Sequence, residues 1–217
     1  MLLYNGQGHV ELIDHMGSDI SVVKAARVSI GKGSKGEEAD AKLIRFLMRE
    51  RHTSPFEHCL LTYSFKVPLF VARQHMRHRT WSFNEISRRY TSEDLAFWSP
   101  EKFRAQATRN LQCSNGFIAD HDVTMATAAF EQAVEKAVKA YYALLDMGIC
   151  REQARAVLPQ GMMTRYYGTV NLHNLMHFLG LRRGSHAQPE IRVMAEACLE
   201  LARPLFPVSI EAWEGKS

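Results

Sequence analysis

The chain has 217 residues, of which 46% are apolar and 23% charged, with a formal net charge of +4. These values are ordinary for one soluble globular domain, here taken as residues 1–217, and too weakly basic to favour a duplex-binding protein. No stretch reaches the ~18 apolar residues of a membrane span, and no signal peptide is evident, so we expect no membrane association. The four cysteines are scattered without a CxxC pair, which favours a reduced, cytoplasmic protein.

The first part of the chain alternates short strand and helix patterns. Apolar residues alternate with polar ones over Leu61–Val67, as in a half-buried strand. GKGSKG at Gly31–Gly36 matches G-x-G-x-x-G, but Glu37 and Glu38 follow at once and would repel a pyrophosphate, so we interpret it as a mobile surface loop. The expected elements are a strand at Val10–Ile13, a helix from Asp19 or Ser21 to Arg27, a helix at Glu38–Arg49 and a strand at Leu61–Val67.

The remainder of the chain is mostly helical. Leu172, Leu175, Met176 and Leu179 follow the i, i+3, i+4, i+7 rule after a capping Asn171. The expected elements are a helix from Pro68 to about Arg79, a short helical turn from Ser82, an irregular segment at Ser92–Asp122, helices at Val123–Met147 and Arg151–Val157, a strand at Thr164–Val170, a helix after Asn171 and a final helix at Pro189–Ala202. Strands and helices do not alternate regularly, so we predict an α+β (mixed α/β) fold.

The most distinctive stretch is Arg77–Tyr90, RHRTWSFNEISRRY, with four arginines and one acid. Arginine presents a planar fork of donors that matches phosphate and carboxylate oxygens. The interleaved serines and asparagine suit a ligand with several oxygens and a ring. The stretch therefore favours an anion-binding site, and the alternative is a basic surface turn paired to acids elsewhere.

The histidines raise the possibility of a metal site. His173 and His177 stand four apart on one predicted helix, and His52, Glu57 and His58 lie together in RHTSPFEH. A zinc hydrolase could use such residues, but the spacing gives no third ligand, so we expect no metal site. Ordinary helix and turn histidines are the alternative reading.

Several further residues are open to two readings. Ser87 lacks a G-x-S-x-G elbow and an adjacent base, so it is assigned as a ligand contact rather than a nucleophile. Arg182 and Arg183 suit the C-terminus of a helix by charge alone, but Ser185, His186 and Gln188 add more donors than a cap requires. Arg155 is either a surface pair with Glu152 or a further anion contact.

Taken together, these segments resemble the flavin-dependent thymidylate synthases. RHR, seven residues and then Ser, inside RHRTWSFNEISRRY, is similar to that family's signature. DISVVKAARVS, HTSPFEH, VPLFVARQHMRHR, REQARAVLP, TVNLHNLMHFLGLR and SHAQPEI also resemble the family and occur in its order. Residues Ser92–Asp122 carry no such resemblance.

The resemblance implies a reaction, a fold and an assembly. The family transfers a methylene group from methylenetetrahydrofolate to C5 of dUMP, and reduced FAD, with NADPH as the usual reductant, completes the methyl group of dTMP. No enzyme cysteine adds to the uracil ring. The implied fold is a central sheet flanked by helices with a helical part, assembled as a homotetramer with active sites between subunits.

The resemblance also implies roles for individual residues. Arg182 is the expected catalytic residue, a cation that polarises the uracil ring. The FAD-binding positions are His52, Ser54, Arg77, His78, Arg79, Glu85, Asn171, His173 and His177. The dUMP-binding positions are Gln74, Arg77, Glu85, Ser87, Arg88, Arg89, Arg155 and Arg182, of which Arg155 and Arg182 match arginines that a neighbouring subunit supplies. Arg88 stands where the family often has glycine, so its backbone N–H is the expected contact.

Three alternatives remain at this point. A nucleic-acid-binding protein would use the arginine-rich stretch and bind oligonucleotides with a steep dependence on salt. A metal-dependent hydrolase would use the histidines and would contain a metal. A family member that has lost activity would keep only a structural role.

Overall fold

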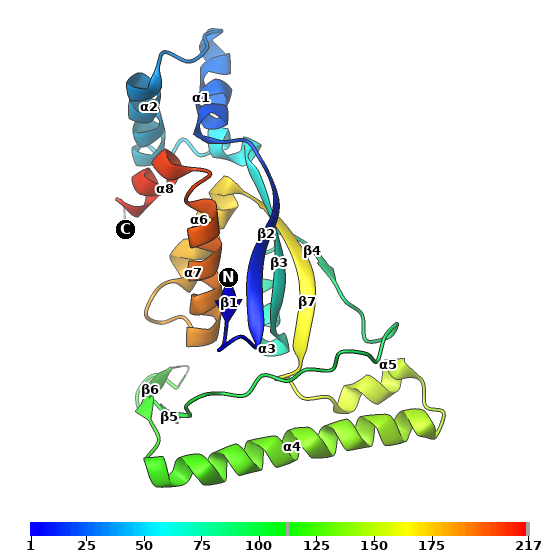
Figure 1. The fold of residues 1–217 in the computed structure, drawn as a ribbon. Coiled ribbons are helices and arrows are strands. Elements are labelled where there is room, and N and C mark those ends of the chain that lie inside the picture. Colours follow the sequence, from blue (N-terminus) through cyan, green and yellow to red (C-terminus); the bar gives the residue numbers. More distant parts are fainter. Residues whose placement is uncertain (112, 216–217) are drawn as a thin grey trace.

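The computed structural model describes residues 1–111 and 113–215. Its centre is an antiparallel sheet in the order β1-β2-β3-β7-β4 (Figure 1). The strands are β1 (Leu2–Leu3), β2 (Gly8–Met16), β3 (Leu60–Pro68), β7 (Met163–Asn171) and β4 (Ser82–Glu85). The mixed α/β class predicted from the sequence is confirmed.

One face of the sheet forms the core because side chains alternate along the strands. On β3, Leu61, Tyr63, Phe65 and Val67 are fully buried. The intervening residues turn to the other face, where the Thr62 and Thr169 hydroxyls lie 2.9 Å apart across β3 and β7. That second face carries polar side chains and is left uncovered by the helices (Figure 1).

Helices cover the apolar face of the sheet (Figure 1). Helix α7 packs on β2 and on α6, and α3 follows β3 directly. Helices α1, α2 and α8 pack together at one end of the sheet. The bounds of these helices are α1 (Asp19–Arg27), α2 (Glu37–Arg49), α3 (Leu69–His75), α6 (Leu172–Arg182), α7 (Pro189–Ala202) and α8 (Pro207–Glu214).

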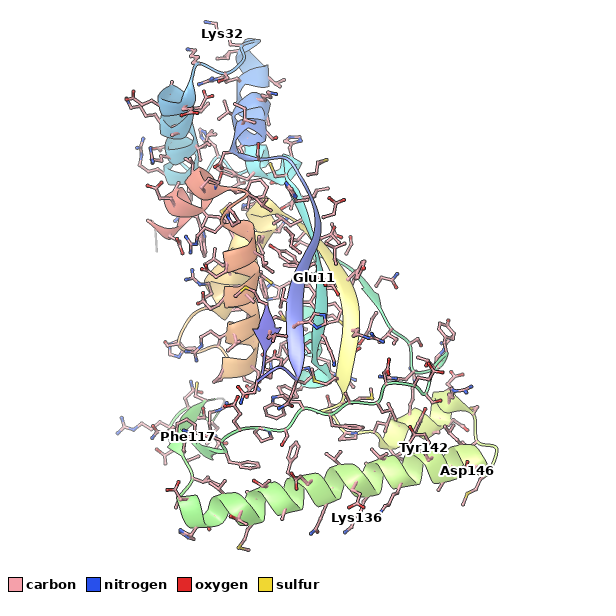
Figure 2. The ribbon with its side chains drawn as sticks, in the orientation of Figure 1. Glu11, Lys32, Phe117, Lys136, Tyr142 and Asp146 are labelled. Atoms are coloured by element: carbon pink, nitrogen blue, oxygen red, sulfur yellow. The ribbon has the colours of Figure 1, made fainter. Side chains whose placement is uncertain are left out.

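Helix α4 (Asp120–Asp146) lies across the opposite end of the molecule with the short α5 (Arg151–Ala154) beside it (Figure 1). Figure 2 shows side chains along its whole length, with Phe117 near one end and Asp146 near the other. Of its residues only Tyr141 is buried. Phe130 packs edge-on against Trp98 with ring centres 6.2 Å apart, whereas other apolar side chains of α4, such as Met125 at 75% exposed, face solvent.

Several boundaries differ from the predictions. Ser82–Glu85 is strand β4, not a helical turn, because it pairs with Tyr166–Thr169 of β7 and this ladder outweighs the local capping-box spacing. Helix α3 ends at His75 rather than near Arg79. The segment Ser92–Asp122 contains a hairpin of β5 (Arg104–Gln106) and β6 (Ser114–Phe117), although residue 112 lies outside the described residues. Helix α8 was not predicted, so the helix at Pro189–Ala202 is not the last.

The glycine-rich loop is confirmed as a surface loop, since its residues are exposed and helix, not strand, precedes it. A buried ion pair at its base joins Arg27 and Asp40 at 2.6 Å, and Arg27 also donates to the Gly33 carbonyl. Separately, the described helices include none with the length and apolar character to span a bilayer.

Candidate functional site

A cavity of 660 Å³ opens where β4, β7, α3 and α5 meet. It is named here the Ser87 cavity. Its polar lining consists of Arg73, Glu85, Ser87, Arg88, Glu152, Arg155, Gln160 and Thr164. Its size is that of a small-molecule site, and three arginines against two carboxylates give it a positive balance.

The sequence places these side chains by simple local rules. Glu85 ends β4 opposite Tyr166, and the Thr164 hydroxyl two residues away donates to Glu85 Oε1 at 2.5 Å. The chain leaves α5 through the 3₁₀ turn η3 (Arg155–Val157) and returns past Pro159 into β7, which brings Arg155 beside Ser87. One protomer's own Arg155 therefore lines the cavity, whereas the family resemblance implied that a neighbour supplies it.

The two arginines after Ser87 behave differently. Arg88 is buried, and its guanidinium donates to the carbonyls of Glu93 (2.5 Å) and Asp94 (3.2 Å). Arg89 is exposed, and its guanidinium lies 5.6 Å from the centre of the Tyr90 ring. The Arg88 side chain is thus anchored in its own loop.

A second group, named here the Arg182 cluster, comprises Gln74, His78, Arg182 and Gln188. Arg182 Nε donates to His78 Nε2 at 3.0 Å, and Arg182 Nη2 donates to the Gln74 carbonyl at 3.3 Å. The Gln74 side chain in turn donates to Gln188 Oε1 at 2.6 Å. None of these residues lines the Ser87 cavity in the part of the chain that the structure describes.

Histidines beside Arg182 are held neutral. Burial, Arg182 and His177 lower the pKa of His78 to about 4. Burial lowers the pKa of His75 well below its ordinary value, and His78 and Arg182 add to this effect. The fully buried His75 bonds Tyr166 through Nδ1 at 2.9 Å and packs edge-on against Trp81.

Several FAD-binding positions implied by the resemblance lie along α6 and in the segment after α3. Asn171 caps α6 by accepting from the Asn174 N–H at 2.9 Å. His177 lies one turn after His173 on α6, and its ring centre is 6.5 Å from that of His78. Arg77 and Arg79 are exposed and form no ion pair with any described residue. Exposed cations in the segment after α3 and histidine rings along α6 fit an anionic dinucleotide such as FAD.

His52 and Ser54, two further expected FAD contacts, lie just before and at the start of a short helical turn. Ser54 begins the 3₁₀ turn η2 (Ser54–His58), which packs against α6. His52 is exposed, and its ring stands edge-on to Phe46 with centres 5.9 Å apart. The structure thus places the turn that begins at Ser54 against the helix that carries His173 and His177, and the ring of His52 beside α2.

Two other kinds of catalytic site, a metal centre and a reactive cysteine, have no matching group of side chains among the described residues. Among the described residues no three His, Cys, Asp or Glu side chains are grouped to hold a metal ion. Cys59 and Cys198 are buried, and burial raises the pKa of both thiols, that of Cys59 to about 11. None of the four cysteines lines the Ser87 cavity, as far as its described lining shows.

Three contributors to these sites were not identified in the sequence. Arg73 and Thr164 line the Ser87 cavity, and His75 supports the ring packing near His78. Strand alternation offered a signal for Thr164, because it shares a face with Tyr166. Gln188, noted in the sequence only as a loop donor, holds Gln74 through a bond between residues 114 positions apart, which no local pattern marks.

Comparison with protein families and relatives adds independent findings. The model of the family described as "Thymidylate synthase complementing protein" matches residues 11–208. A Thermus thermophilus protein named "Flavin-dependent thymidylate synthase" is 48% identical over 208 residues, which are 96% of this chain and 76% of that protein. A Kosmotoga olearia protein of the same name is 43% identical over 208 residues, which are 95% of this chain and 90% of that protein.

Solved structures agree with the sequence comparison. The crystal structure of the UMP/dUMP methylase PolB from Streptomyces cacaoi bound with 5-Br dUMP superposes with a TM-score of 0.88 at 39% identity, covering 96% of this chain and 95% of that one. The same protein bound with 5-Br UMP gives a TM-score of 0.86 at 40% identity, covering 96% of this chain and 94% of that one.

Proposed function

This chain belongs to the thymidylate synthase complementing protein family, the flavin-dependent thymidylate synthases, and from that premise we propose that it converts dUMP to dTMP. Methylenetetrahydrofolate is the proposed carbon donor and NADPH the proposed reductant. The observation that carries the proposal is the Ser87 cavity, which gathers Glu85 and Ser87 from one segment of the chain and Arg155 from another. We assign residues 1–217 to a single domain.

The Ser87 cavity suits a nucleoside monophosphate. Arg155 and the backbone N–H of Arg88 are donors for the phosphate, and charge-assisted bonds to phosphate are strong. The Ser87 hydroxyl offers a further contact, and Glu85 Oε2 remains available for a ligand N–H or O–H because Thr164 engages Oε1. We assign Gln74, Arg77, Arg88 and Arg89 to the same substrate, Arg88 through its backbone.

Arg182 is the proposed catalytic residue. Uracil C5 is a weak nucleophile, and a fixed cation near the N3 and O2 edge of the ring favours its electron-rich form. The hydrogen bonds of Arg182 Nε and Nη2 fix the guanidinium plane and leave the Nη1 edge for a ligand. Arg77 lies near enough to lower the pKa of Arg182, after burial, so two positive charges converge here.

FAD is the proposed cofactor, which supplies the hydride when bound in its reduced form. Arg77 and Arg79 would hold its phosphates, with His78, Glu85 and Asn171 as further contacts. His52, Ser54, His173 and His177 complete the proposed flavin face along α6 and η2. The exposed, unpaired arginines support this assignment.

No cysteine takes part in the proposed reaction. Buried thiols with raised pKa values, such as Cys59, are poor nucleophiles because the thiolate is the reactive form. The position of the cysteines outside the described lining of the Ser87 cavity supports the same view.

We propose a homotetramer with active sites between subunits. The Ser87 cavity and the Arg182 cluster do not share a described residue, so one protomer presents two halves of a site. The exposed length of α4, on which Met125 is 75% exposed, also supports burial against other copies. In this arrangement Arg182 and Gln74 of one subunit face the Ser87 cavity of another.

The proposal is tested by assaying the purified protein with FAD, NADPH, methylenetetrahydrofolate and dUMP, and analysing the products chromatographically. We expect dTMP and tetrahydrofolate. Because the solved relatives are described as UMP/dUMP methylases, UMP is assayed in parallel. Methylation of UMP alone would replace dUMP as the substrate, and no methylated product with flavin bound would remove the proposed activity.

A further inference from the structure

We propose that His78 is a positioning residue whose Nε2 lone pair holds the Arg182 guanidinium in its working orientation. The inference rests on the proposed function, in which Arg182 polarises the uracil ring. It adds a role that does not involve contact between His78 and FAD.

The geometry of Arg182 shows how it is held. Arg182 is the last residue of α6, at a helix end where a long side chain has wide freedom. Two acceptors limit that freedom, His78 Nε2 at 3.0 Å from Nε and the Gln74 carbonyl at 3.3 Å from Nη2. Two bonds from different nitrogens of one planar group fix both its position and its plane.

The His78 ring is itself held firmly. It is only 9% exposed, and its backbone N–H bonds the His75 carbonyl at 2.9 Å in the turn after α3. The ring stands at 87° to Phe178, with centres 5.0 Å apart. Since Phe178 lies on α6 with Arg182, the same helix supports the acceptor ring and carries the arginine.

Only neutral histidine can serve as this acceptor. Arg182 Nε–H is a donor, so His78 Nε2 must carry a lone pair and the ring proton must sit on Nδ1. Three groups face the ring, namely Arg182 and His177 from α6 and His75 from α3. Of these, Arg182 and His177 disfavour a second proton on His78. The lowered pKa of His78 agrees with this, so the contact persists throughout the neutral pH range.

This role gives a physical reason for a histidine between Arg77 and Arg79. Arginine or lysine at position 78 would offer only donors and would repel Arg182. The two flanking arginines are exposed and available to anions, while His78 is turned inward to Arg182. The RHR segment would therefore combine two exposed anion-binding side chains with one buried acceptor.

The test compares two substitutions of His78. In His78→Gln the amide oxygen can still accept from Arg182, whereas His78→Leu removes the acceptor and keeps an apolar side chain of moderate size. With FAD and dUMP saturating, we expect kcat to fall about 100-fold in His78→Leu, the scale of a misplaced catalytic group, and less than 10-fold in His78→Gln. Bound-flavin absorbance is expected to remain in both, because Arg77 and Arg79 stay in place to hold the FAD phosphates and His78 is only one of several further contacts. A crystal structure of His78→Leu is expected to show Arg182 displaced.

A double substitution tests whether His78 acts through Arg182. In an Arg182→Ala background, His78→Leu is expected to change the residual turnover less than twofold, because the group it positions is already gone. If His78→Leu fails to fold by circular dichroism, His78→Asn replaces it, since the shorter amide does not reach Arg182.

Three results would overturn the proposal. They are equal turnover in His78→Leu and His78→Gln, loss of flavin from both variants in parallel with activity, and an unmoved Arg182 in the His78→Leu structure. Failure of the proposed function is recognised separately, because the wild-type protein would then make no dTMP while the crystal structures still report on Arg182.

Discussion

Arg182 and Arg183 are neighbours at the end of α6 with different partners. Arg183 bonds Glu196 at 2.9 Å and lies 3.6 Å from Glu214, two carboxylates that satisfy its charge. Arg182 has no ion pair among the described residues and bonds only neutral acceptors. The charge of Arg182 is therefore left for a ligand, which is the property that a catalytic cation needs.

Replacing Arg182 tests whether its charge acts on the bound substrate. Arg182→Ala is expected to lower kcat by about 10²–10³-fold, because a preorganised electrostatic contact to the reacting ring is lost. FAD absorbance is expected to remain. Arg183→Ala is the matched control, and near wild-type turnover is expected from it. Equal losses in the two variants, measured by steady-state dTMP formation, would show that Arg182 has no special part.

The pH dependence of the protein's stability tests whether His78 is uncharged in the folded state. Between pH 6.5 and about 4 the unfolded chain binds a proton at His78 that the folded chain excludes. The free energy of unfolding therefore falls as the pH drops through this window, by about 3 kcal/mol from this residue. His75 acts in the same direction.

Thermal midpoints at pH 7.0, 5.5 and 4.0 measure this dependence. The decline is expected to be shallower in His78→Gln than in the wild type, with His75 and all carboxylates unchanged between the two proteins. Parallel declines would mean that His78 is charged in the folded protein over this range.

Residue-level prediction from the sequence was uneven for physical reasons. The arginines and Ser87 were identified because their chemistry is concentrated in one stretch, and the structure places Glu85, Ser87 and Arg88 around one cavity. Gln188 was noted only as a donor in a loop, since its bond to Gln74 joins residues 114 positions apart. Contacts of this kind depend on the fold and leave no local pattern.

At the scale of elements, α8 depends on a residue of α1. The Asp19 carboxylate accepts from the Val208 N–H at 2.8 Å and the Ser209 N–H at 3.0 Å, and the Ser209 hydroxyl bonds it too. These are the first N–H groups of α8, which have no partner inside the helix. Asp19 thus caps a helix that begins near residue 207 and joins two ends of the chain.

Asp19→Ala is expected to destabilise the protein by about 2 kcal/mol, since a charged, partly buried acceptor is lost from several donors. The thermal midpoint should fall by about 4–8 °C. Asp14→Ala is the control, because the exposed Asp14 carboxylate accepts from the backbone N–H of its neighbour His15, and it should change stability by less than about 0.5 kcal/mol. Equal midpoints in both variants would contradict the capping role.

Arg155, the first residue of the turn η3, provides a test of whether the Ser87 cavity binds dUMP. Arg155→Ala is expected to raise the KM for dUMP about 10- to 100-fold, the range of a lost hydrogen bond to a charged group. Arg151→Ala, at an exposed position on α5, is the control and should leave KM near the wild-type value. An unchanged KM in Arg155→Ala would place the nucleotide elsewhere.

Elements were predicted well where their pattern is long and local. The periodic helix after Asn171 and the alternating strand at Leu61–Val67 both appear within a residue or two of their predicted bounds. Ser82–Glu85 was predicted wrongly because a short segment takes its structure from the strand it pairs with. Helix α8 escaped prediction because its start is marked by the distant Asp19.

At the scale of the whole molecule, the separation of the Ser87 cavity from the Arg182 cluster is the central feature. The sequence alone did not show this division, because it depends on which face of α3 and β7 each residue occupies. In the proposed assembly, each complete site would therefore contain residues of two chains.

Subunit mixing tests the division. Arg155→Ala and Arg182→Ala proteins are expected to be weakly active alone. After mild dissociation and reassembly together, some interfaces would pair an intact Ser87 cavity with an intact Arg182 cluster, so dTMP formation should rise several-fold above both parents. Light scattering should give a mass four times that of one chain. A mixture no more active than its parents, with subunit exchange verified, would place both arginines in a site within one chain.

The most direct test of the account is dTMP formation by the purified protein with FAD, NADPH, methylenetetrahydrofolate and dUMP, measured together with the flavin absorbance of the same sample. We expect a bound flavin, and dTMP formation that requires each of the four components. A folded protein that binds flavin and dUMP but forms no dTMP would contradict it.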